Sequence, residues 1–151
     1  IDCGTAIVGW SVIQKTGVKL KAIDQGAIIT DKDELMANRL KKIYKELVSL
    51  IDKYNPEEMA IEDLFFFKNK KTVISVGQAR GVIMLAGANS NLPVYDYTPL
   101  QVKVAVSGYG KADKKQVQFM VQRILGLKSV PKLDDITDAM AVSICHLNSV
   151  L

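Results

Sequence analysis

A buried strand that follows a helix is the feature that most constrains the fold of this chain. Residues 58–64 contain the apolar run Met59-Ala60-Ile61, which ends at the acid Glu62 and lacks the alternation of a half-exposed strand. Strands buried on both faces are typical of sheets that contain parallel pairs, and a strand that follows a helix is most simply placed parallel to an earlier one. The segment therefore predicts an α/β fold with Glu62 at the end of an interior strand.

The remaining segments predict a mixed sheet. The chain begins at Ile1 within the first expected strand, so a few leading residues are expected to precede it. We expect an antiparallel meander of three strands within residues 1–30, followed by a helix that a capping box opens at 31–34 and Asn55-Pro56 ends. The strand at 58–64, a helix at 72–91 and a fifth strand at 94–97 come next. The last three helices are expected to open at Thr98, Asp113 and about Asp134. This order predicts a five-stranded α/β sheet flanked by helices on both faces, in one domain over residues 1–151.

Composition excludes several classes of site. The formal net charge of +4 permits an anionic partner, and no apolar run approaches the length of a membrane span. The chain has one histidine and two cysteines, in no metal-binding or redox spacing. We expect His146 to be a surface imidazole, Cys3 a small buried side chain and Cys145 a core thiol, in a reducing cytoplasm. Any catalysis would therefore depend on carboxylates and lysines.

Four acids stand where a cation site could form: Asp2, Glu62, Asp135 and Asp138. Asp2 precedes the turn at Gly4 and Glu62 ends the neighbouring strand, while Asp135 and Asp138 share one helical face. A set of oxygen ligands suits Mg²⁺ or Mn²⁺. Each acid also has a simpler interpretation, because Asp134 and Asp135 could cap the last helix, Asp2 could be a turn residue and Glu62 could pair with a lysine. Asp96 is interpreted as an exposed strand carboxylate.

Aromatic and basic residues follow Glu62 directly. Neighbouring residues of a strand face opposite sides, so Phe65, Phe66 and Phe67 cannot all face the core. We assign Phe65 to stacking on an unpaired base and leave core packing to the other two. Lysines flank the expected site and could be solvated surface charges, but their concentration favours contacts with phosphate; they are Lys68, Lys70, Lys71, Lys103, Lys111, Lys114 and Lys115.

Over essentially its whole length, the chain resembles the RuvC family of Holliday-junction resolvases, nucleases with a ribonuclease H-like fold. The residues that carry the resemblance are Ile1-Asp2-Cys3-Gly4-Thr5 with Gly9; Ala60-Ile61-Glu62 with Phe65 and Asn69; Gly77-Gln78-Ala79-Arg80-Gly81-Val82; Leu92-Pro93-Val94-Tyr95; Gln101-Val102-Lys103; Gly108-Tyr109-Gly110-Lys111-Ala112; and Asp135-Ile136-Thr137-Asp138-Ala139. Many independent segments in the family's order make this a strong signal.

The resemblance implies that Asp2, Glu62, Asp135 and Asp138 bind two Mg²⁺ ions per subunit, which Mn²⁺ can replace. It also implies a homodimer on a four-way DNA junction, with the helix around Gln78 to Gly81 at the interface. A RuvA/RuvB branch-migration complex is a candidate further partner. The residues assigned to DNA binding are Phe65, Lys68, Asn69, Arg80, Lys103, Lys111 and Lys114.

Two departures from the family pattern bear on the site. Cys3 stands where the family usually has proline, and one residue is inserted within 128–134. The insertion leaves open whether Asp134 or Asp135 is the ligand, and the D-x-x-D-A pattern favours Asp135. Neither departure removes a metal ligand.

We therefore expect a cytoplasmic, metal-dependent endonuclease that cuts two opposed strands of a Holliday junction during recombination and DNA repair. Ile1 to Thr5 also resembles the phosphate-binding turn of actin-like ATPases and sugar kinases, but those proteins need a second such turn and a second domain. A related nuclease acting on structured RNA, or a non-catalytic junction-binding module, is the alternative. Four acids near DNA would repel phosphate unless metal is bound, which favours catalysis.

Overall fold

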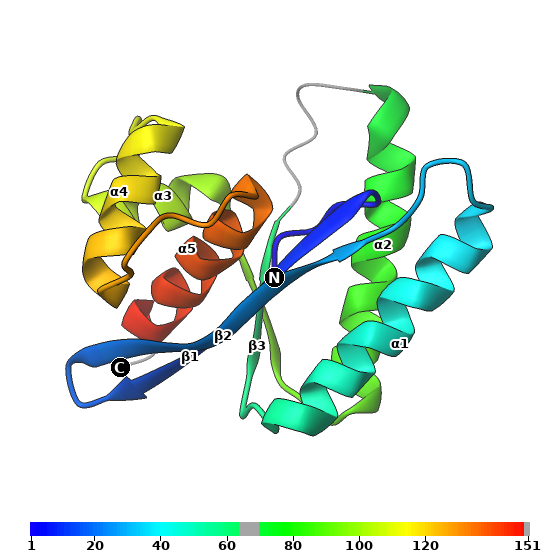
Figure 1. Cartoon of the computed structure of the whole chain (residues 1–151), viewed down its shortest axis with the longest axis horizontal. Coiled ribbons are helices and arrows are strands. Elements are labelled where there is room, and N and C mark those ends of the chain that lie inside the picture. The colour runs from blue at the N-terminus through cyan, green and yellow to red at the C-terminus, as the bar shows by residue number, and fades with distance from the viewer. Residues whose placement is uncertain (64–69, 150–151) are drawn as a thin grey trace.

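The strands form a twisted central layer with helices on both sides (Figure 1). The computed structural model describes residues 1–63 and 70–149. The elements in chain order are β1 (Ile7–Thr16), β2 (Lys19–Ile29), α1 (Met36–Tyr54), β3 (Met59–Glu62), α2 (Lys70–Asn89), β4 (Val94–Tyr97), α3 (Pro99–Ser107), α4 (Lys114–Leu125) and α5 (Asp134–Ser149). Helices α1 and α2 lie on one side of the strands and α3, α4 and α5 on the other.

The strands pair in two ladders that the first residues of the chain join. β1 and β2 form an antiparallel hairpin, and β3 runs parallel to β4. The Ile1 amine donates to the Ala60 carbonyl at 2.7 Å, and Asp2 forms an antiparallel bridge with Gly9. Within the described ranges the strands form two two-stranded sheets, where one five-stranded sheet was expected. The expected first strand is reduced to Ile1 and Asp2, which bond to β3 and β1 but are too short to count as a strand.

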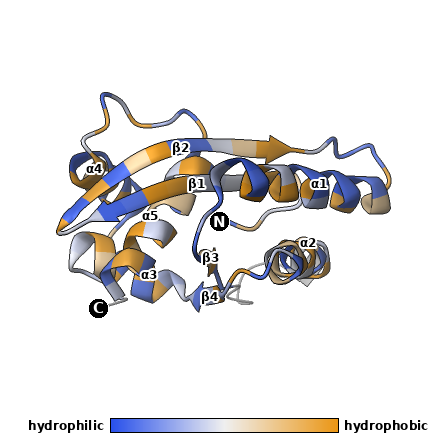
Figure 2. Cartoon of the chain, turned by 90° about the horizontal axis from the view of Figure 1, so that it is seen from below, coloured by the Kyte–Doolittle hydropathy of each residue, from blue (hydrophilic) through white to orange (hydrophobic). Residues whose placement is uncertain are grey.

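Two cores lie on opposite faces of the strands. Met59 and Ile61 face the core that α1 and α2 cover, whereas Ala60 between them faces the core that α3, α4 and α5 cover. This is the two-residue period of a strand buried on both faces. Orange and blue segments follow one another along β2 (Figure 2), where exposed and partly buried residues alternate from Lys19 to Gln25. The predicted helices on both faces are therefore confirmed.

Helix ends follow the sequence signals at most positions. Thr98 with Gln101 and Asp113 with Gln116 form complete capping boxes at the starts of α3 and α4, as predicted. The capping box expected at residues 31–34 is wrong. The Asp31 carboxylate instead accepts a hydrogen bond from the Asp33 amide at 2.9 Å, and α1 begins at Met36 without a side-chain cap.

Helix α2 leaves apolar side chains uncovered. Ile74 is 73% exposed and Leu85 is 51% exposed. The chain therefore presents an apolar surface on α2 that its own core does not use. Within residues 1–63 and 70–149, no helix has the length and apolar character needed to cross a membrane.

Candidate active site

Asp2 and Glu62 are neighbours because their strands pair. The Glu62 amide donates to the Ile1 carbonyl at 3.0 Å, so the end of β3 lies beside the start of the chain. The Asp2 amide in turn donates to the Gly9 carbonyl at 3.0 Å, and the Gly9 amide donates back to Asp2 at 3.1 Å. The sequence predicted this pairing from the apolar run that ends at Glu62.

The other two acids reach this place on the first turns of α5. A Cβ atom added to Gly9 would lie 1.9 Å from the Asp135 carbonyl oxygen, so α5 packs directly on β1 where a side chain would prevent it. Gly9 is also the bridge partner of Asp2. The start of α5, which carries Asp135 and Asp138, is therefore held against the strand that pairs with Asp2.

The carboxylates perturb one another. Burial raises the pKa of Glu62 to about 7, with the charges of Asp2 and Asp138 adding to the shift. Burial likewise raises the pKa of Asp2 to about 6, helped by Asp138 and Asp135. Burial also raises the pKa of Asp138. The half-buried acids repel one another when ionised, which is the condition that a bound cation relieves.

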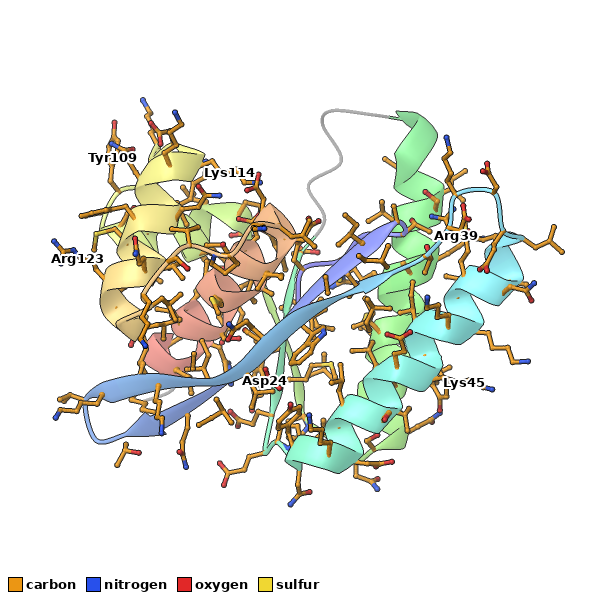
Figure 3. All side chains as sticks on the ribbon, in the orientation of Figure 1. Asp24, Arg39, Lys45, Tyr109, Lys114 and Arg123 are labelled. Atoms are coloured by element: carbon orange, nitrogen blue, oxygen red, sulfur yellow. The ribbon has the colours of Figure 1, made fainter. Side chains whose placement is uncertain are left out.

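Lys114 contacts this group of acids through an ion pair. Its Nζ lies 3.1 Å from a carboxylate oxygen of Asp138 and 3.1 Å from one of Asp134. Figure 3 shows Lys114 at the start of α4, beside the start of α5. Burial opposes the charge of Lys114, but its hydrogen bonds to Asp134 and Asp138 outweigh that effect and raise its pKa. Lys114 thus neutralises part of the acid group.

The donor set fits a hard divalent cation. The four predicted ligands offer only carboxylate oxygens, the ligand type that Mg²⁺ and Mn²⁺ prefer. In the part of the chain that the structure describes, no three acidic, histidine or cysteine side chains stand arranged to hold an ion. The side chains would therefore have to turn toward one another to hold an ion.

Asp134 and Asp135 differ in their surroundings. The Asp134 carboxylate contacts Lys114 and accepts a hydrogen bond from Gln118 Nε2 at 2.9 Å. Asp135 is the residue that adds to the raised pKa of Asp2. The packing of Asp135 against Gly9, the bridge partner of Asp2, favours Asp135 as the member of the acid group, as the D-x-x-D-A spacing does.

Arg80 lies against its own chain. Its guanidinium is 2.6 Å from Asp96 and 3.6 Å from Asp63, and its side chain is 20% exposed. Asp96 is an exposed strand carboxylate, as predicted, but it also forms an ion pair with Arg80 that no spacing in the sequence indicated. Whether Arg80 also contacts DNA stays a prediction.

The other predicted DNA-binding residues are dispersed around the site. Lys103 lies on α3 and is partly exposed, and Lys111 is exposed just before α4. Phe65, Lys68 and Asn69 lie outside the described residues. The role of each stays a prediction.

Sequence reasoning missed a polar network at the far end of β3. His146 is not a surface imidazole, since it is 5% exposed and both ring nitrogens have partners. Its position after the apolar run 139–145, interrupted only by Ser143, could have indicated burial. Cys3 and Cys145 are buried, as predicted.

A groove of about 560 Å³ lies at that end of β3 as well. Its lining includes Trp10, Tyr54, Glu58 and His146, and none of the four predicted metal ligands lines it. The acids lie instead at the opposite end of β3. The groove therefore does not define the candidate site.

Comparison with known proteins gives a consistent result. The family model described as "Crossover junction endodeoxyribonuclease RuvC" matches residues 1–146. A protein of that name from Halothermothrix orenii is 56% identical over 149 residues, covering 99% of this chain and 90% of the relative. One from Fusobacterium nucleatum is 55% identical over 150 residues, covering 99% of this chain and 79% of the relative. The solved structure described as "T. thermophilus RuvC in complex with Holliday junction substrate" is 32% identical, with a TM-score of 0.92 over 97% of this chain and 90% of that one.

Proposed function

The chain belongs to the RuvC family of crossover junction endodeoxyribonucleases, and we propose on that basis that it cleaves two opposed strands of four-way DNA junctions by metal-dependent hydrolysis. Its α/β fold is ribonuclease H-like. The observation that carries the proposal is the approach of Asp2, Glu62 and the start of α5 at one end of β3. The reaction would leave 5′-phosphate and 3′-hydroxyl ends.

Asp2, Glu62, Asp135 and Asp138 would hold two Mg²⁺ ions per subunit, and Mn²⁺ would substitute. Bound there, the ions would supply an activated water and charge stabilisation for an in-line displacement at phosphorus. The raised pKa values of Asp2 and Glu62 support this assignment, since they reflect buried carboxylates that repel one another. Lys114 would pass from Asp138 to the DNA phosphate as the acids become ligands.

The DNA contacts would surround the acid group. Phe65 would stack on an unpaired base near the crossover, and the polar contacts would fix the position of the backbone without reading sequence. The polar residues proposed for this role are Lys68, Asn69, Arg80, Lys103, Lys111 and Lys114. The placement of Lys114 beside Asp138 supports its share of the role.

Two copies of one domain, residues 1–151, would bind one junction. The exposed Ile74 and Leu85 of α2 support a homodimer through that helix, because they form an apolar surface that a second copy would bury. The hydrogen bonds of Ile1 and Asp2 support a five-stranded sheet in which their strand lies between β1 and β3. We place the enzyme in the cytoplasm, with a RuvA/RuvB complex as a candidate partner.

The substrate class is tested by offering the chain three labelled nucleic acids of equal length with Mg²⁺: a mobile four-way DNA junction, a linear DNA duplex and a folded RNA hairpin. We expect cleavage of the junction at least about 100-fold faster than that of either other substrate. Preferential cleavage of the RNA would favour the alternative of a nuclease for structured RNA. Equal cleavage of junction and duplex would contradict the proposal.

A further inference from the structure

His146, in the last turn of α5, contacts side chains from the segment before β3 and from β4. Its Nε2 lies 2.7 Å from a carboxylate oxygen of Glu58, the residue just before β3, and its Nδ1 lies 2.8 Å from the Tyr97 hydroxyl of β4. A neutral ring satisfies both contacts, with Nε2–H donating to Glu58 and Nδ1 accepting from Tyr97. The ring of Tyr95 packs against the imidazole at an interplanar angle of 39°, with a centroid distance of 4.8 Å. The imidazole is thus held on several sides.

The contacts of His146 involve β3 and α5, which also carry Glu62 and Asp138. Glu62 ends β3 and Asp138 lies in the first turns of α5, while Glu58 precedes β3 and His146 lies in the last turn of α5. The two elements therefore run in opposite directions, and each carries an acid near one end and a member of the network near the other.

The spans between these positions match. The four residues from Glu58 to Glu62 extend about 13 Å along a strand. The eight residues from Asp138 to His146 extend about 12 Å along a helix. A bond between His146 and Glu58 therefore limits where Asp138 can lie along β3 relative to Glu62, and a slip of α5 by one residue would move Asp138 by about 1.5 Å.

Tyr97 adds a second constraint on the same relation. It is the register partner of Glu62 in the β3–β4 ladder, and its carbonyl accepts a hydrogen bond from the Asp63 amide at 2.8 Å. Its side chain is buried and bonds to His146. The residue that pairs with Glu62 through its backbone thus holds α5 through its hydroxyl.

We propose that His146 is a positioning residue whose bonds to Glu58 and Tyr97 fix α5 along β3, and thereby set the approach of Asp138 to Glu62. This inference rests on the proposed function, in which those two acids share metal ions. At about 12 Å along the helix from Asp138, His146 does not touch the reacting groups. Its effect is on how closely two carboxylates of the metal site approach.

The test measures Mn²⁺ binding by titration calorimetry without DNA. The variants are His146→Phe, which keeps a ring of similar size, and Glu58→Ala, which removes the carboxylate from a side chain that is 33% exposed. Glu58→Gln keeps an oxygen that can accept from Nε2–H. Val142→Ala is the matched control, because Val142 is fully buried on the same helix outside the network.

We expect His146→Phe and Glu58→Ala to bind Mn²⁺ about 10-fold more weakly, at the low end for residues that orient ligands. Glu58→Gln should stay within about twofold of the parent, and Val142→Ala should lose thermal stability without losing Mn²⁺ affinity. If His146→Phe does not fold, the comparison of Mn²⁺ affinity between Glu58→Ala and Glu58→Gln still tests the inference. Parent-like Mn²⁺ affinity in Glu58→Ala would overturn the inference and leave a purely structural role.

The outcome is independent of the substrate assignment. If the parent cleaves junctions and Glu58→Ala binds Mn²⁺ as the parent does, the inference fails and the proposed function stands. If Glu58→Ala loses affinity but the parent does not cleave junctions, the positioning role stands and the proposed function fails.

Discussion

The carbonyl oxygen of Asp135 lies so close to Gly9 that no side chain fits between α5 and β1. Gly9→Ala should therefore push the start of α5 away from the strand that pairs with Asp2. We expect a loss of about 1–3 kcal/mol in the free energy of unfolding, as for other overpacked sites, together with a loss of Mn²⁺ affinity.

Gly26→Ala is the matched control for that change. A Cβ atom at Gly26 would lie 2.7 Å from the Trp10 ring, also on the hairpin but at a side chain rather than at a predicted ligand. Denaturant unfolding and metal titration of both variants separate the two effects. A Gly9→Ala variant that binds Mn²⁺ like Gly26→Ala would show that α5 does not need this contact for the metal site.

Glu62→Gln should stabilise the metal-free protein at neutral and higher pH. The pKa of Glu62 rises from 4.5 to about 7 on folding, so between these values the folded state binds more protons than the unfolded state. The stability of the parent therefore falls as pH rises through this window. The glutamine variant lacks this loss and should be more stable at pH 8 by about 1–3 kcal/mol.

Thermal unfolding with a chelator, from pH 4 to pH 8, measures the difference. Added Mn²⁺ should raise the unfolding temperature of the parent and leave that of Glu62→Gln nearly unchanged. If Glu62→Gln is less stable than the parent at pH 8 without metal, the ionised Glu62 carboxylate does not destabilise the folded state, and the prediction is wrong.

Asp134 and Asp135 should respond differently to loss of charge. Asp135→Asn should lower the rate of junction cleavage by about 100-fold or more. Loss of a residue that only orients a metal ligand usually lowers activity by about 10- to 100-fold. Asp134→Asn should lower the cleavage rate by less than about 10-fold, since Asp134 contacts Lys114 and Gln118. Single-turnover cleavage at saturating enzyme makes the comparison. The reverse order would assign the ligand to Asp134.

Arg80 should contribute modestly to stability whatever its part in DNA binding. Arg80→Ala removes the ion pair with Asp96, whose side chain is 43% exposed, so we expect a loss of about 1 kcal/mol or less in the free energy of unfolding. Asp96→Asn should cost less, and the double variant should lose less than the sum of the two. Additive losses in denaturant unfolding would show that the ion pair contributes nothing.

Local signals predicted local structure well. The capping residues Thr98 and Asp113 and the helix end at Gly126 depend on contacts within four residues, so the sequence carries them directly. Asp31 shows the limit of such signals, because the same carboxylate can close a turn before a helix instead of capping it. The neighbourhood of Asp2 and Glu62 was also predictable, since it follows from one buried strand.

Relations across the fold were not predictable in this way. The apolar run before His146 indicates burial, but nothing in the sequence indicates that Glu58 and Tyr97 are its partners. Arg80 and Asp96 meet because α2 packs beside β4, and no spacing in the sequence indicates that contact. The distances within these pairs depend on how helices pack on strands, which periodicity does not specify.

The most direct test of the account is cleavage of a mobile four-way junction with Mg²⁺, with each strand end-labelled in turn, by the parent and by Glu62→Gln. We predict paired nicks at symmetric positions of two opposed strands from the parent, and junction binding without cleavage from the variant. Binding without nicks from the parent, or equal nicking by Glu62→Gln, would contradict the claim that the acids at the end of β3 resolve DNA junctions.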